Sequence, residues 1–152
     1  MTASFDLDEI DRTILCSLRG DGRMSLQEMS RRSGISDATL HFRLKRLKSS
    51  GAIERFTIIA SPAATGYSVA AIIMLQTDTE RHDQAEAALA DIPEVTEVYG
   101  ILGEYDLYVK VWSRSLEELN SLINDRIRSI EGIEDLHEMV VVKRVKEETP
   151  LV

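Results

Sequence analysis

Residues 67–75 read YSVAAIIML, and this segment places apolar side chains on both faces of any strand that it forms. Alternate residues of a strand point to opposite faces, so one face receives Val69, Ala71, Ile73 and Leu75, and the other receives Ala70, Ile72 and Met74. The segment at residues 135–143 repeats this pattern around Met139. A sheet built from such strands must be covered on both faces, because contiguous apolar surface is rarely left in water.

The segments that surround this strand predict a βαββαβ arrangement. Strands are expected at residues 67–77, 95–102, 106–112 and 135–143, and helices at residues 80–91 and 116–130. This order is that of the ferredoxin-like split βαβ fold. Two helices cover only one face of a four-stranded sheet, so a second copy of the chain is the natural cover for the other face. We therefore expect a homodimer.

The first third of the chain carries helical periodicity and capping signals instead. A first helix is expected near residues 8–20. Ser25, with Glu28 three residues later, has the pattern of a capping box at the start of a second helix. Ser36 caps a third helix that runs until Gly51. Three helices in about 45 residues predict a small helical domain.

The second and third helices are separated by only three or four residues including a glycine, which is typical of a helix-turn-helix. The third helix is expected to be the reader helix, which contacts the DNA bases. Its leucine stripe faces the core, while short polar groups and then basic groups lie on the other side. The residues predicted to bind double-stranded DNA are Ser36, Asp37, Ala38, Thr39, His41, Phe42, Arg43, Lys45 and Arg46. The alternative is a solvated basic face on a helical bundle.

Charge is divided unevenly along the chain. The net charge is −8, but residues 1–56 carry +2 and the remainder carries −10. Residues 23–55 hold eight basic against three acidic side chains. A local basic surface on an acidic protein still binds phosphate, because counterion release depends on the contacting surface. Charge therefore favours DNA binding by the first part alone.

The two parts are joined by the segment AIERFTIIASPAATG, which predicts a short strand and a connector. The expected domains are a helix-turn-helix domain at residues 1–56, a hinge strand or linker at 57–66 and a ferredoxin-like domain at 67–152. The fold class is therefore α+β, with a winged-type helix-turn-helix domain before the βαββαβ domain. With no apolar run long enough for a bilayer and no leader pattern, no membrane contact and a cytoplasmic location are expected.

The turn GILGEYD precedes the strand expected at residues 106–112. Gly100 and Gly103 leave backbone amides approachable, Glu104 or Asp106 can receive an ammonium group, and Tyr105 can form the wall of a pocket. A free amino acid requires both kinds of partner, for its carboxylate and its ammonium. The alternative is an ordinary hairpin whose glycines set the turn and whose acids are solvated.

The chain resembles the Lrp/AsnC, or feast/famine, family of transcriptional regulators. The segments LDEIDRTILCSLRGDGRMSLQEMSRRSGIS and RLKRLKSSGAIERF resemble that family's helix-turn-helix, and IPEVTEVYGILGEYDLYVKV and IRSIEGIEDLHEMVVVK are similar to its ligand-binding module. The resemblance implies regulation of amino-acid metabolism, dimers that often assemble into octamers, and a small effector, commonly an amino acid, held between dimers. The effector residues that it implies are Gly100, Leu102, Gly103, Glu104, Tyr105, Asp106, Leu136 and Glu138.

Two departures from that family's pattern leave the effector class open. Glu104 stands where members often carry aspartate, and Leu136 and Glu138 stand where hydroxyl residues are common. Glu138 opposite an acidic turn favours a cationic ligand such as lysine or arginine, or no ligand at all.

Two rival functions remain at this point. Siroheme decarboxylases resemble the same two-domain arrangement, but the −10 charge of the second part disfavours a tetrapyrrole with several carboxylates. His41, His82 and His137 lie on separate segments without the spacing of a metal site, so no catalytic residue, metal or cofactor is expected. The other rival is an effector-free regulator or an assembly module that has lost DNA binding, against which the basic residues of the third helix argue.

Overall fold

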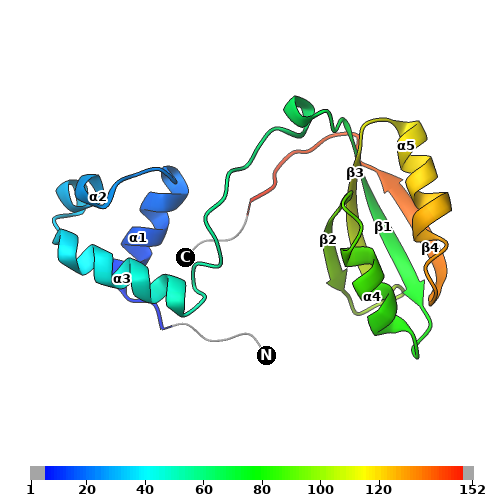
Figure 1. Ribbon diagram of the computed structural model, residues 1–152, viewed down its shortest axis with the longest axis horizontal. Helices are drawn as coiled ribbons and strands as arrows, with labels where there is room; N and C mark the ends of the chain where they lie inside the picture. The colour runs from blue at the N-terminus through cyan, green and yellow to red at the C-terminus, as the bar shows by residue number, and fades with distance from the viewer. Residues whose placement is uncertain (1–5, 149–152) are drawn as a thin grey trace. The chain divides into compact units, whose positions relative to one another are not determined.

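The protein is described by a computed structural model for residues 6–148 (Figure 1). The outermost parts of the expected domains, residues 1–5 and 149–152, lie outside the described residues. The described chain divides into two compact units, one formed by residues 6–59 with 147–148 and the other by residues 60–146.

The first unit contains the three expected helices, α1 (Glu9–Gly20), α2 (Leu26–Ser33) and α3 (Asp37–Ser49). Each contributes to a small apolar core whose fully buried members are Ile14, Met29, Leu40 and Leu47. Partly buried neighbours such as Ile10 and Leu18 on α1 and Leu44 on α3 complete this core, since positions three, four and seven apart share one face of a helix. The sequence prediction of three helices is confirmed.

Capping at the helix starts differs in part from expectation. At α1 the Asp8 carboxylate accepts hydrogen bonds from backbone N–H groups, and the Asp11 carboxylate accepts one from the backbone of Asp8, which makes a reciprocal capping box. At α2 the Ser25 hydroxyl accepts from the backbone of Glu28, but the Glu28 carboxylate turns to two arginines of its own helix. The expected box at α2 is therefore half formed, and the complete one lies at α1.

The second unit has the predicted βαββαβ order, with a four-stranded sheet in the order β2-β3-β1-β4 and every neighbouring pair antiparallel. Its elements are β1 (Val69–Thr77), α4 (His82–Ala90), β2 (Val95–Gly100), β3 (Leu107–Ser113), α5 (Leu116–Ser121) and β4 (Ile133–Val140). α5 continues as a π-helical segment at Leu122–Ile127. No helix within residues 6–148 is long and apolar enough to cross a membrane.

The two helices of this unit pack on the same face of its sheet (Figure 1). Ala71, Ile73 and Leu75 of β1 are fully buried there, with side chains of α4 and α5 against them. On the opposite face Ile72 is only partly buried, and Met139 of β4 is 42% exposed. Both sheet faces thus carry apolar side chains, although Lys110 and His137 also lie on the open face, and the described helices cover the other one.

The segment between the two units does not form the expected short strand. Residues 54–61 have no ladder partner in the described chain, and a strand exists only where its backbone groups find one. The side chains of Phe56, Ile58 and Ile59 in this segment are exposed. The connector that follows is a short 3-10 turn, Pro62–Thr65, which ends at Gly66 with φ of 86°.

Candidate functional site

The start of α3 is fixed by its own side chains. Gly34 ends α2 in the left-handed region, with φ of 74°. The Ser36 hydroxyl then accepts a hydrogen bond from the backbone N–H of Thr39 at 3.2 Å and lies 2.8 Å from the Thr39 hydroxyl. Asp37 adds an acidic group near the positive end of the helix dipole. Three of the predicted DNA-binding residues, Ser36, Asp37 and Thr39, therefore set where the reader helix begins.

The face of α3 opposite its buried leucines carries Ala38, Phe42 and Lys45, all exposed. These positions lie three and four residues apart and about half a helical turn from Leu40, so they share one outward stripe. Phe42 is 67% exposed. The structure thus brings together an apolar and a cationic group on the outward stripe that the sequence predicted.

Two predicted DNA-binding arginines contact α1 instead of protruding freely. The Arg43 guanidinium forms an ion pair with Asp8 and lies 3.4 Å from Asp11, and the Arg46 guanidinium donates a hydrogen bond to the same oxygen of Asp11. The Arg43 side chain is only 20% exposed, and that of Arg46 is 44% exposed. Arg43 thus joins two helices of the unit, whereas Arg46 retains a solvent-facing side.

The Asp8 carboxylate in this cluster is held in its ionised form. A hydrogen bond from the backbone of Asp11 lowers the pKa of Asp8 below its ordinary value of 3.8, and the Arg43 guanidinium adds to this. The pairing with Asp8 raises the pKa of Arg43. Asp11 itself is fully buried, and its second oxygen has no hydrogen-bond partner among the described residues. Asp11 was not among the predicted site residues, although an acid three residues after an acidic cap is a recognisable capping pattern.

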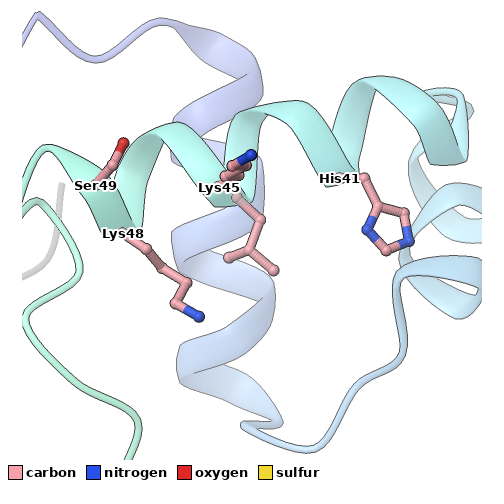
Figure 2. A pocket seen from close by; sticks show the side chains of 5 residues that line it. His41, Lys45, Lys48 and Ser49 are labelled. Atoms are coloured by element: carbon pink, nitrogen blue, oxygen red, sulfur yellow. The ribbon is translucent and has the colours of Figure 1, made fainter.

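An open groove of about 450 Å³ runs along one flank of α3 (Figure 2). It is lined by His41, Leu44, Lys45, Lys48 and Ser49. The Lys48 ammonium lies 5.8 Å from the centre of the Phe56 ring, which is a cation–π contact. His41 lies 3.5 Å from the Asp37 carboxylate. Lys48 was absent from the predicted set, although it follows Lys45 by three residues, the spacing of neighbours on one helix face.

The turn at residues 100–106 is hydrogen-bonded to the end of β1. The amide of Gln76 donates a hydrogen bond to the Glu104 carbonyl at 2.8 Å. The Asp106 carboxylate accepts from the backbone N–H of Thr77 at 2.8 Å and from the Thr77 hydroxyl at 3.2 Å. Asp106 is thus a structural acceptor in this chain, whereas the exposed Glu104 carboxylate has no hydrogen bond or ion pair within the described residues.

The same contacts continue into α4. The Thr77 hydroxyl lies 2.8 Å from Nδ1 of His82, and the other ring nitrogen of His82 lies 3.3 Å from the Glu86 carboxylate. A Cβ placed on Gly100 would meet that carboxylate at 3.4 Å. Sequence reasoning did not connect these residues, because only the packing of α4 against the sheet brings them together.

The remaining predicted effector residues lie in different surroundings. Leu102 is fully exposed at the turn, and Tyr105 is half-buried. Leu136 of β4 is buried in the core opposite Leu75. Glu138 lies 3.7 Å from the Arg128 guanidinium. That ion pair partly neutralises Glu138, so its charge favours a cationic ligand less than the sequence alone predicted.

Comparison with known proteins identifies the family. Residues 70–151 match the model described as the Lrp/AsnC ligand binding domain, and residues 7–54 match that for winged helix-turn-helix DNA-binding. The HTH-type transcriptional regulator FL11 of Pyrococcus furiosus is 40% identical over 145 residues, which is 95% of this chain and 95% of that relative.

Solved structures agree over almost the full length. That of Escherichia coli AsnC matches with a TM-score of 0.90 at 30% identity, covering 96% of this chain and 99% of that chain. A Neisseria meningitidis transcriptional regulator in complex with L-methionine also gives 0.90, at 25% identity and 96% coverage of each chain. With both family models and these relatives in agreement, the chain belongs to the Lrp/AsnC family of helix-turn-helix transcriptional regulators.

Proposed function

We propose that this regulator recognises double-stranded DNA by placing α3 in the major groove. The main support for this proposal is the outward stripe of α3. It is exposed, belongs to a helix whose start is fixed by a cap, and lies beside a groove that is lined by two lysines. In a helix-turn-helix the second helix enters the groove with its first residues near base edges. Ala38 and Phe42 then lie toward the bases, and Lys45 and Lys48 toward phosphates.

The arginine cluster has a different part in this proposal. Arg43 and Arg46 hold α3 against α1 through Asp11 and fix the angle at which the reader helix is presented. The solvent-facing side of Arg46 also adds positive charge to the surface that meets the duplex. Replacing both arginines therefore removes a structural contact as well as charge, and does not test DNA contact alone.

DNA binding is tested by in vitro selection from a random double-stranded library, followed by fluorescence anisotropy titration of the selected duplex. A sequence-specific regulator enriches one motif and binds it far more tightly than random duplex at the same salt concentration. Failure to enrich any motif, with the protein folded, would overturn the proposal.

We further propose that an amino acid acts as the effector at the turn of residues 100–106. The Neisseria relative was solved with L-methionine, and the Glu104 carboxylate is exposed and available for an ammonium group. Asp106, already bonded to Thr77, shapes the turn that presents it. A thermal-shift screen of the twenty amino acids tests this, because a ligand that binds only the folded state raises the melting temperature.

The variant that tests the role of Glu104 is Glu104→Gln, which preserves the size of the side chain and removes its charge. We expect the shift seen with the best ligand to shrink in this variant while its unliganded melting temperature stays unchanged. A flat screen would contradict the amino-acid effector and leave either an effector-free regulator or a regulator that binds a different metabolite.

We propose that the open sheet face forms the dimer contact. It carries partly buried and exposed apolar side chains, among them Ile72, Met74 and Met139, which a second sheet would cover. Dimers then assemble into octamers. An effector held between dimers selects the assembly state, and the assembly state determines which spaced half-sites are bound together. Light scattering after size exclusion measures the mass directly. A monomer at micromolar concentration would contradict this part.

A further inference from the structure

Phe42 of α3 is the strongly exposed large apolar side chain within the three helices of the first unit. We propose that its ring contacts the C5-methyl group of a thymine in the major groove and thereby selects an A·T pair at one position in each half-site. This inference rests on the proposed DNA binding by α3 and assigns a specific chemistry to one of its residues.

The position of Phe42 gives it no role in the core of its unit. Leu40 and Leu47 fill the buried side of α3, and Phe42 lies on the opposite side with 67% of its surface exposed. An exposed phenyl ring contributes little to stability. Covering the ring with apolar atoms removes its surface from water and is favourable in free energy. The ring is therefore placed for a surface that comes from outside the unit.

The neighbours of Phe42 limit what that surface can be. Ala38 lies one turn earlier on the same stripe, and Lys45 lies about one turn later. Arg43 and Arg46 are drawn toward Asp11 on α1. The outward stripe thus has an apolar part at its N-terminal half and a cationic part beyond it.

Duplex DNA offers a matching arrangement. The phenyl ring has no hydrogen-bond donor or acceptor, and the only apolar group on a base edge in the major groove is the thymine methyl. Phosphates flank that groove and suit Lys45 and Lys48. A protein partner would instead have to supply carboxylates around the same apolar spot to match the two lysines.

The test uses uracil, which differs from thymine only by the missing methyl group. After in vitro selection with the full-length protein, each thymine of the selected half-site is replaced singly by uracil in fluorescence anisotropy probes. We expect one position per half-site at which uracil weakens binding about fourfold, the effect of exposing one buried methyl. The other positions are expected to change much less.

Two variants connect that loss to Phe42. In Phe42→Ala the thymine and uracil probes should bind equally at the sensitive position, and selection with this variant should no longer enrich thymine there. Lys45→Ala is the matched control on the same stripe. It should weaken every probe by a similar factor and retain the fourfold difference between thymine and uracil.

Each outcome decides one question. Selection that yields no motif refutes DNA reading by this chain, and the thymine contact with it. A selected motif that tolerates uracil at every thymine refutes the contact alone, as does a uracil effect that persists in Phe42→Ala. If Phe42→Ala instead changes the mass in solution while uracil has no effect, the ring contacts another protein surface. The uracil series on the unmodified protein stays decisive even if the variant fails to fold.

Discussion

α3 and the turn at residues 100–106 are both proposed binding regions, but they combine structure and recognition in different ways. On α3 the helical period separates the buried leucines from Phe42 and Lys45, so side chains can be changed on one side without touching the other. In the turn, Asp106 both anchors β1 and lies where a ligand is expected. Recognition is therefore separable from stability on α3, and only partly separable in the turn.

The largest loss of stability is expected from a change on the side of α3 that packs against α1, where the predicted DNA-binding arginines also have a structural role. Asp11→Ala removes a buried carboxylate and leaves Arg43 and Arg46 without their shared partner, so unfolding of the first unit should become easier by about 2–4 kcal/mol. Urea denaturation followed by circular dichroism measures this. Asp37→Ala, on exposed surface of the same unit, is the control and should cost much less. Equal stabilities in the two variants would show that the cluster is not structural.

The turn should give the next largest change. Asp106→Ala breaks the hydrogen bonds to Thr77, and we expect the stability of the second unit to fall by about 1–2 kcal/mol. Any ligand-induced shift should disappear as well. Glu104→Ala should abolish the ligand shift alone, since only its backbone carbonyl holds the turn. If Asp106→Ala has the wild-type melting temperature, Asp106 is free for a ligand and the contrast with α3 is lost.

On the outward stripe, Lys45→Ala should leave stability unchanged and weaken DNA binding at every sequence. Removing one phosphate-binding cation reduces the slope of log affinity against log salt concentration by about 0.9 for each protomer bound to the duplex. Titrations between low and moderate salt measure that slope. Arg12→Ala, which removes an exposed cation from α1, serves as the control. The assignment of Lys45 to a phosphate would be contradicted if both variants had the same slope as the unmodified protein.

The smallest effect should come from the acid titration of Asp8. Its pKa in the folded protein lies below 3.8, so its ionised form stabilises the fold above that pH and the contribution is lost as pH falls further. Asp8→Asn should therefore narrow the difference in stability between pH 5 and pH 3. Thermal unfolding across this range measures it. An unchanged difference would show that other carboxylates control acid stability.

Local signals in the sequence were sufficient for most of the fold. The caps, the leucine stripe of α3 and the alternating strands predicted the three helices and the βαββαβ order, because each depends on neighbours along the chain. Pairings between distant residues were not accessible in this way. The contact of Arg43 with Asp8 joins positions 35 apart in sequence, and that of Asp106 with Thr77 joins positions 29 apart. The sequence pointed to Arg43 and Asp106, but only the packing of the elements showed which partners they have.

The central claim is that the outward stripe of α3 recognises DNA sequence. It is tested most directly by comparing the affinity for the selected duplex with that for a random duplex at one salt concentration, in the unmodified protein and in a Phe42→Ala, Lys45→Ala double variant. We expect a preference of about a thousandfold or more in the unmodified protein. The loss of the Phe42 contact should lower this preference by about fourfold per half-site, whereas the loss of Lys45 weakens both duplexes alike. The double variant should keep the same free energy of unfolding. Equal preference in both proteins would contradict the claim.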